Sequence, residues 1–165
     1  MIIRRAKKKD IDKLSVLFDK YRIFYKQSSD IDKLSVLFDK YRIFYKQSSD
    51  IDNAKSFLKK RMKRKESMIF VAEERKELVG FTQLFPIFSS VSMKRTWLLN
   101  DLYVNEKARG MGTASKLLDA ARDFGAETNS KWLILQTAAD NFIAQKAYEK
   151  NGWVKETDFF YRKDI

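Results

Sequence analysis

The stretch 98–118, "LLNDLYVNEKARGMGTASKLL", joins an apolar strand-like run to a helix-like run through a loop with glycines at 110 and 112. Glycines there let the backbone come close to a ligand, and the free N–H groups and dipole of the following helix favour an anion. The stretch lacks the Gly-Lys-Ser/Thr of a Walker loop and the three-glycine spacing of a dinucleotide fold. It predicts a pyrophosphate cradle, with a purely structural helix entry as the alternative.

The composition indicates one domain that spans residues 1–165. With 44% apolar residues, the chain can bury one full core but hardly two. No run approaches the roughly 18 apolar residues of a membrane span, and "MIIRRAKKKD" has no apolar stretch of a secretion signal. We therefore expect a cytoplasmic protein without a membrane partner. Because the sequence has no Cys and no His, thiol nucleophiles, disulfides and histidine bases are excluded.

The net charge of +12 favours anionic ligands, and nucleic acid is one candidate. The densest basic cluster, "KKRMKRKE" at 59–66, follows Ala54, Phe57, Leu58 and Met62 at helical spacing. Its charges therefore fall mainly on the opposite face of that helix. A solvated helix face explains this cluster, and we expect no nucleic acid partner.

The order of apolar patterns predicts an α/β fold. Alternating and short apolar runs predict strands at 2–5, 68–73, 78–85, 97–104, 132–137 and 153–162, the last broken into two. Pro86 is expected to end the third strand. Residues 142–150 form a short helix, and two further helices have apolar faces made of Ile11, Leu14, Leu17, Phe18 and Tyr21 and of Ala114, Leu117, Leu118, Ala121 and Phe124. These elements alternate, which favours helices packed around a mixed sheet.

An exact tandem repeat interrupts this pattern, because "IDKLSVLFDKYRIFYKQSSD" occupies residues 11–30 and again 31–50. A shift of twenty residues turns an α-helix by roughly 200° beyond whole turns, so one continuous helix would point the two apolar faces apart. Ser28, Ser29 and Asp30 offer a break where the second copy restarts. We expect one copy on the sheet and the other looped out, appended as a helix or packed against a second molecule as a homodimer. We interpret the extra copy as an insertion without a catalytic role.

The ordered set "LLNDLYV…ARGMGTASKLL…LQTAADNFIAQKAYEKNGWVKE…FFYRKD" resembles the GNAT superfamily of N-acetyltransferases over essentially the whole chain outside the extra copy. The resemblance implies a mixed, mostly antiparallel sheet that splays between its fourth and fifth strands, and acetyl-coenzyme A as cosubstrate. Arg109, Gly112 and Ala114 fall on the defined positions of the family's Arg/Gln-x-x-Gly-x-Gly/Ala signature. The pyrophosphate role is therefore implied for Arg109, Gly110, Met111, Gly112, Thr113 and Ala114.

The resemblance also implies the rest of the cosubstrate site. Backbone groups of Leu102, Tyr103 and Val104 would face the pantetheine arm, and one of their N–H groups would stabilise the oxyanion. Asn141 matches the asparagine that meets the pantetheine, and Tyr148 matches the tyrosine that protonates the departing thiolate. A phenol suits that step, because it can donate a proton to a sulfur anion. The alternative for Tyr148 is a helix residue that packs under the sheet.

The implied reaction is direct attack of a neutral amine on the thioester, which needs no covalent intermediate. Many family members carry a glutamate in the strand that corresponds to "LLNDLYV", where this chain has Asn100 followed by Asp101. Asp101 is the best local base, with a structural carboxylate as the alternative. Since neighbouring strand residues alternate faces, Asn100 and Asp101 can both point at the acceptor only if a bulge intervenes.

The acceptor is the least defined part of the site, and a small primary amine is our hypothesis. We expect its groove to be lined by the loop 86–95 and the end of the first helical region, with Phe85, Phe88 and Ser92. A polyamine would need a local acidic patch of Asp101, Glu156 and Asp158. An amino acid or a protein N-terminus stays open as acceptor, and a noncatalytic acyl-coenzyme A sensor is the alternative function.

Overall fold

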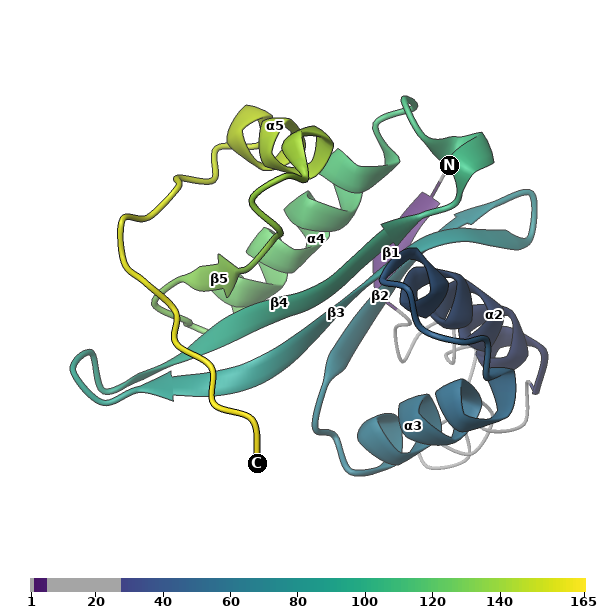
Figure 1. Cartoon of the computed structure of the whole chain (residues 1–165), viewed down its shortest axis with the longest axis horizontal. Coiled ribbons are helices and arrows are strands. Elements are labelled where there is room, and N and C mark those ends of the chain that lie inside the picture. Colours follow the sequence, from purple (N-terminus) through teal and green to yellow (C-terminus); the bar gives the residue numbers. More distant parts are fainter. Residues whose placement is uncertain (1, 6–27) are drawn as a thin grey trace.

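The computed structural model describes residues 2–5 and 28–165, in which one mixed sheet is flanked by helices (Figure 1). Its strands lie in the order β1-β2-β3-β4-β5. Neighbours run antiparallel except for β4 and β5, which are parallel. The strands are β1 Ile2–Arg5, β2 Met68–Glu74, β3 Glu77–Ser89, β4 Lys94–Val104 and β5 Leu133–Leu135. The predicted mixed, mostly antiparallel sheet is confirmed.

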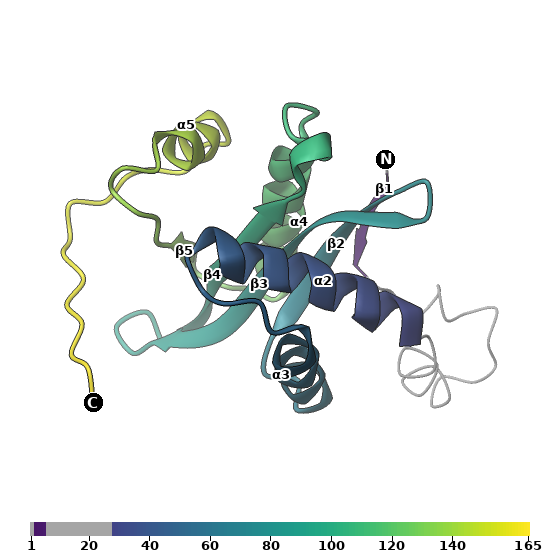
Figure 2. The ribbon, with the colours of Figure 1, turned by 45° about the vertical axis from the view of Figure 1, so that its right-hand side comes forward.

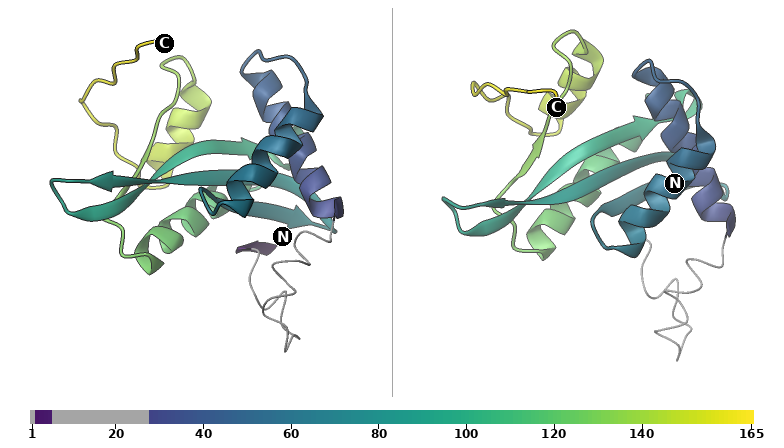
Figure 3. Two further views of the ribbon diagram at one scale, coloured as in Figure 1. Left: turned by 90° about the horizontal axis from the view of Figure 1, so that it is seen from below. Right: turned by 60° about the horizontal axis from the view of Figure 1, so that its bottom comes forward.

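Helices cover both faces of this sheet (Figure 3). Those described are α2 Ser28–Phe44, α3 Ile51–Lys63, α4 Thr113–Glu127 and α5 Phe142–Lys150, with the 3₁₀ turn η1 Glu106–Ala108 before α4. In the described part of the chain, no helix combines the length and apolar character that crossing a membrane requires. The two faces carry separate cores, because alternate residues of each strand point to opposite sides.

One core lies under α4. Leu117, Leu118, Ala121 and Phe124 are buried against strand residues such as Phe70 and Leu99, so the apolar face predicted for this helix is confirmed. The rings of Phe124 and Trp97 lie 4.9 Å apart between centroids.

The second core lies under α2 and α3. Ala54 and Leu58 of α3 are buried, whereas Lys59 and Lys60 are exposed on its outer face. This confirms that the basic cluster lies on a solvated helix face. Phe57 is an exception to the predicted apolar face, because it is exposed and stacks on Phe38 at 5.7 Å between ring centroids.

The second repeat copy, 31–50, supplies helix α2. Ile31, Leu34, Leu37 and Phe38 are buried in the same core as Phe81 of β3. Since the two copies are identical, the sequence could not tell which one packs on the sheet. The structure assigns that place to copy 31–50. Most of the other copy lies outside the described residues, so the expectation that it is looped out, appended or packed against a second molecule stays a prediction.

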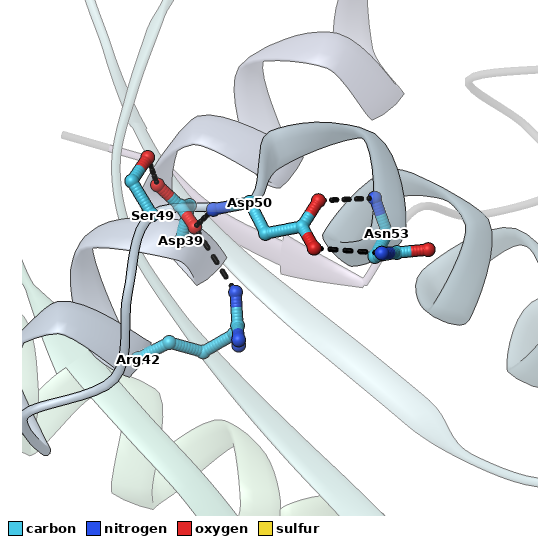
Figure 4. A network of polar contacts seen from close by, with 5 residues as sticks. All are labelled: Asp39, Arg42, Ser49, Asp50 and Asn53. Carbon is cyan, nitrogen blue, oxygen red and sulfur yellow. Dashed lines mark hydrogen bonds and ion pairs between the residues drawn. The ribbon is translucent and has the colours of Figure 1, made fainter.

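A buried carboxylate ties the end of α2 to the start of α3 (Figure 4). Asp39 accepts hydrogen bonds from the Ser49 hydroxyl at 2.6 Å and the Asp50 N–H at 2.7 Å, and it pairs with Arg42 at 3.2 Å. Asp50 in turn caps α3 by accepting from the Asn53 N–H at 3.1 Å. Burial raises the pKa of the Asp39 carboxyl, but the three donors outweigh burial and hold it below its ordinary value.

Asn53 also distinguishes the two copies. It is the first residue after the second copy that departs from the repeat pattern, because Lys33 stands at the equivalent place after the first copy. The amide Nδ2 of Asn53 donates to Asp50 at 2.6 Å. Lys33 instead donates its Nζ to the Lys76 carbonyl at 2.6 Å and to Glu77 at 3.2 Å. The contact of Asn53 with Asp50 favours the copy that directly precedes α3.

Two strand predictions were wrong. β3 continues through Pro86 to Ser89, with Pro86 opposite Trp97. A proline is tolerated there because β2 pairs with β3 only as far as Leu84, which leaves one side of the later residues without a strand partner among the described residues.

The predicted strands at 153–162 do not form, and the tail after α5 runs away from the sheet (Figure 2). Trp153 still packs near Tyr148, with ring centroids 6.3 Å apart. Beyond it Phe159, Phe160 and Tyr161 are exposed. The apolar pattern of the tail is typical of a strand, but a strand needs an edge to pair with, and the tail pairs with no strand of the described part of the chain.

We expect Asp39→Asn to lower the free energy of unfolding by about 1–3 kcal/mol, because it weakens the charge-assisted bonds that hold the α2–α3 connection. The loss should appear as a lower Tm at pH 7. It should shrink as the pH falls below about 4, because the lowered pKa gives stability only while the carboxylate is charged.

The repeat provides a matched control, because Asp19 is the same residue in the first copy. Asp19→Asn is expected to leave the Tm unchanged. Equal losses from the two variants would contradict the assignment of copy 31–50 to the sheet.

Candidate active site

A β-bulge in β4 places Asn100 and Asp101 together. Asp101 lies opposite Gln83 and Leu99 lies opposite Leu84, so Asn100 is an extra residue without a partner in β3. The bulge brings the Asn100 amide within 3.0 Å of the Asp101 carboxylate, to which it donates a hydrogen bond. Consecutive strand residues normally point to opposite faces, so this contact exists because of the extra residue.

The bulge also marks the end of the pairing between β4 and β5. That pairing covers Trp97, Leu98 and Leu99, and β5 ends at Leu135. In the described residues the later part of β4 pairs with β3 alone. Sheet pairing therefore stops next to Asp101, and one side of β4 beyond Leu99 is left without a strand.

The backbone direction in that part of β4 follows from one contact. The Asn105 N–H donates to Val79 of β3 at 2.8 Å. Since the N–H groups of a strand alternate in direction, the Tyr103 N–H also points toward β3, whereas those of Leu102 and Val104 point to the side without a strand. Leu102, Tyr103 and Val104, which the sequence predicted to face the pantetheine arm, are therefore not equivalent as donors.

Asp101 is a buried carboxylate, with 4% of the residue exposed. Burial raises the pKa of its carboxyl to about 6, although hydrogen bonds from Tyr41 and Asn100 act in the opposite direction. The Tyr41 hydroxyl also lies 3.3 Å from the backbone oxygen of Asn100. A carboxyl with this pKa is ionised at neutral pH and can still accept a proton readily, as a general base must.

Three tyrosines are linked electrostatically at this carboxylate. Tyr41 comes from the last turn of α2, Tyr45 follows directly after α2, and Tyr148 comes from α5. The pKa of each phenol is raised by burial first, that of Tyr148 to about 12. The Asp101 charge adds to the rise for Tyr41 and Tyr45, and Tyr45 adds to the rise for Tyr148. Tyr148 therefore carries its proton at neutral pH and can donate it.

The glycine-rich loop opens α4 as the sequence indicated. Gly110 and Gly112 both have a φ of 75°, in the left-handed region that glycine adopts without strain. A Cβ at either position would meet no atom within 4 Å, so the loop is open to a ligand. Met111 is exposed, whereas Thr113 is buried and donates its hydroxyl to the Ala108 carbonyl at 3.1 Å.

The Arg109 side chain lies against the end of β4. Its Nε donates to the Val104 carbonyl at 3.1 Å, and its guanidinium pairs weakly with Glu106 at 3.9 Å. It also lines a cavity of about 300 Å³ between β4 and the end of α2. The other lining residues are Lys40, Ile43, Phe44, Tyr103, Asn105 and Glu106.

Asn141 has a structural contact. It precedes α5, and its side-chain oxygen accepts a hydrogen bond from the Ala144 N–H at 3.3 Å. This contact caps the helix that carries Tyr148. Its predicted contact with the pantetheine stays a prediction.

Of the residues expected to line the acceptor groove, Phe85 is opposite Leu98 and Phe88 is opposite Arg95, which is six residues before Asp101 on β4, or roughly 20 Å along the strand. Ser92 is farther still, in the turn of that hairpin. Glu156 and Asp158 are in the exposed tail. The side chains that contact Asp101 are those of Tyr41 and Asn100, and the predicted acceptor groove stays a prediction.

Sequence reasoning missed Tyr41 and Tyr45. The signal was present in "YRIFY" at 41–45, a cluster of large apolar residues at the end of a helix whose core face was already supplied by earlier positions. Their nearness to Asp101 depends on how α2 crosses the sheet, which no spacing in the sequence gives.

Comparison with known proteins identifies the family. The model of the acetyltransferase (GNAT) family matches residues 33–153. The uncharacterised N-acetyltransferase YhfO of Bacillus subtilis (strain 168) is 47% identical over 161 residues, which cover 98% of this chain and 95% of that protein. The chain therefore belongs to the GNAT family of acetyltransferases, and it is an acyltransferase.

Solved structures agree with this assignment. The crystal structure of a probable acetyltransferase has a TM-score of 0.82 and 38% identity, covering 100% of this chain and 98% of its own. AAC(6')-Iy in complex with the bisubstrate analogue CoA-S-monomethyl-acetylneamine has a TM-score of 0.69 at 18% identity, covering 84% of this chain and 94% of its own. The second likeness shows the fold alone.

The buried carboxylate gives a stability test. The folded-state pKa of Asp101, about 6, lies above its unfolded value, so the native state binds more protons between pH 4 and 6 and stability falls as the pH rises through that window. We expect Asp101→Asn to remove this cost, which is about 3 kcal/mol at most. The difference in Tm between the variant and the unmodified protein should grow between about pH 4 and 6 and stay constant above that range.

Thermal unfolding at several pH values, with Asp123→Asn as an exposed control, checks this result. A variant that loses stability at pH 8 would show that Asp101 is a structural carboxylate.

Proposed function

We propose that the protein transfers the acetyl group of acetyl-coenzyme A to a primary amine of a small molecule by direct attack. The observation that carries this proposal is the bulge at Asn100, which sets a buried carboxylate beside the place where β4 loses its pairing to β5. A carboxylate that would act as the base thus lies next to this strand edge, with the Tyr41 phenol in contact with it.

The cosubstrate would bind along the open side of β4 and the start of α4. The sheet would splay between β4 and β5 beyond Leu99, and the pantetheine arm would lie against the outward N–H groups of Leu102 and Val104. Its pyrophosphate would meet the N–H groups of 110–114 at the first turn of α4, where the helix dipole favours an anion. Met111, which is exposed, would contribute backbone groups to this cradle.

Arg109 would add positive charge beside the same cradle. Its guanidinium is half exposed, and among the described residues its ion pair is the long one with Glu106. Thr113 is held by Ala108, so its part would be to fix the loop. Ala114 follows, and its side chain is too small to block the approach of the pyrophosphate.

In the reaction the amine nitrogen attacks the thioester carbonyl carbon, and the new C–N bond forms as the carbonyl electrons move to oxygen. Either outward N–H, of Leu102 or of Val104, would stabilise that oxyanion. Asp101 would take the proton that the nitrogen loses, directly or through water. The C–S bond then breaks, and Tyr148 would give its proton to the departing thiolate.

Two alternatives lead to different results. A noncatalytic acyl-coenzyme A sensor would need the loop 109–114 but neither Asp101 nor Tyr148. A protein or peptide N-acetyltransferase would use the same groups on a larger acceptor. The buried Asp101 favours catalysis over sensing, because binding alone does not need a buried carboxylate.

Release of coenzyme A from acetyl-coenzyme A, followed with a thiol reagent across a panel of amines, tests the activity. The enzyme has no cysteine, so it gives no background. We expect Tyr148→Phe to lower kcat by about 10²-fold or more while acetyl-coenzyme A binding persists. Binding without release for any amine or peptide would support the sensor.

We expect Gly112→Arg to abolish cosubstrate binding, because a bulky side chain would occupy the cradle. Gly152 has a φ of 79° and an open Cβ position like that of Gly112, but it follows α5. Gly152→Arg therefore carries similar backbone strain and controls for it. If both variants bind acetyl-coenzyme A equally well by calorimetry, the loop is not the pyrophosphate site.

The pH dependence tests the base. With an acceptor whose own amine pKa lies below 5, kcat/KM should rise with pH and level off above an apparent pKa near 6, the value for Asp101. Asp101→Asn should lower the rate and remove this limb. If kcat/KM of this variant still rises with pH and levels off near the same pKa, the group that titrates is not Asp101.

A further inference from the structure

We propose that Tyr41 in the last turn of α2 and Tyr45 directly after it, together with Asp101, form a recognition site for an ammonium group, and that the site selects amines with no carboxylate next to the nitrogen. This inference rests on the proposed function, because it names the class of acceptor at the same site. It makes the C-terminal end of α2 the part of the protein that determines which acceptor binds.

The geometry of the two rings supports a cation site. Tyr41 and Tyr45 are one helical turn apart, with ring centroids 5.0 Å apart at 65°. The ring of Tyr41 also packs edge-to-face with that of Phe81, with centroids 6.0 Å apart. The Tyr45 residue is 46% exposed, so its ring is open to a ligand. Because the two rings are tilted against each other, a ligand can meet the face of one of them. A ring face attracts a cation within about 6 Å of its centroid.

The charge of Asp101 has no partner in the described part of the chain. Its side-chain contacts there are neutral, from the Tyr41 hydroxyl and the Asn100 amide. No Lys or Arg of residues 28–165 forms an ion pair with it. A buried carboxylate is costly without a cation, and a chain with 34 Lys and Arg could have supplied one. The missing cation is therefore expected to be the ligand.

The same charge predicts what is rejected. The amine binds as an ammonium against Asp101 and the ring faces. It releases one proton to bulk water before it attacks, so that Asp101 stays ionised and takes the second proton, which the nitrogen loses as the C–N bond forms. An acceptor with a carboxylate on the adjacent carbon would bring a second negative charge within a few ångströms of Asp101, in a partly desolvated place where like charges repel strongly. Aliphatic and sugar-type amines are thus favoured over α-amino acids.

A competing arrangement exists nearby. The cavity beside the site has Lys40 and Arg109 in its lining, and these could hold an anionic group of an acceptor. A preference for α-amino acids would mean that this cavity, rather than the tyrosines, decides specificity. Tetramethylammonium binding and the turnover of matched amines and amino acids distinguish the tyrosine site from this cavity.

Binding is measured first, with the tetramethylammonium ion, which cannot be acetylated. It is titrated by calorimetry into the full chain saturated with coenzyme A. We expect Tyr45→Leu to weaken binding about three- to fivefold and Tyr45→Phe to retain it, because the ring and not the hydroxyl attracts the cation. Tyr161, which is 94% exposed in the tail, supplies the control Tyr161→Leu, which should bind as the unmodified protein does.

Turnover is measured second, with pairs that differ by one α-carboxylate, isoamylamine with leucine and tyramine with tyrosine. The amine without the carboxylate should have the higher kcat/KM, and Tyr45→Leu should raise KM for it without changing kcat. Equal tetramethylammonium binding by Tyr45→Leu and the unmodified protein would overturn the proposal. A preference for the amino acids would overturn it as well.

The two proposals fail separately. If tetramethylammonium binds as expected but no amine releases coenzyme A, the ammonium site stands and the proposed transferase activity on small amines falls. If amines are acetylated but Tyr45→Leu changes neither KM nor ion binding, the activity stands and the ammonium site falls.

Discussion

One extra residue in β4 governs the site. Because Asn100 has no partner in β3, the Asp101 side chain and the Asn100 amide meet, and the pairing with β5 ends at the preceding residue. A strand without the bulge would continue to pair and would place these side chains on opposite faces. The carboxylate, its neutral hydrogen-bonding partners and the unpaired backbone beyond Leu99 are thus consequences of one irregularity. That irregularity is stable because Asp101 is enclosed by α2, whose Tyr41 contacts it.

Helix α2 links the packing of the domain to the site. Its buried residues anchor it on Phe81, and its last turns carry the aromatic side chains that face Asp101. Its end is held in place by Asp39, which accepts hydrogen bonds from the connection to α3. The identical repeat makes this arrangement unusual, since residues 11–30 carry the same apolar face. The contact between Asp50 and Asn53 gives the second copy an interaction that the first copy cannot reproduce at its own end.

The charge at the candidate site has the opposite sign to the net charge of the protein. The net charge of +12 suggests anionic partners, and the glycine-rich loop offers a place for a pyrophosphate. The basic cluster on α3 is nevertheless a solvated helix face, and the carboxylate in the site has neutral neighbours in the described residues. In the proposed site an acceptor would therefore meet a negative and aromatic surface within a positive protein. A long-range field and a short-range site can differ in sign because screening and burial act over different distances.

The sequence by itself determined the alternation of strands and helices, the apolar face of α4 and the glycine-rich entry to it, because these depend on local periodicity and on residues with unusual backbone freedom. It also indicated that Asn100 and Asp101 could cooperate only through a bulge. Tertiary structure decided that the bulge forms, that copy 31–50 packs on the sheet, and that Tyr41 and Tyr45 reach Asp101. It also decided that the tail 153–162, despite its strand-like pattern, joins no strand among residues 2–5 and 28–165. Each of these outcomes depends on contacts between segments far apart in the chain, and a periodic pattern specifies which side of an element is apolar but not which neighbour will cover it.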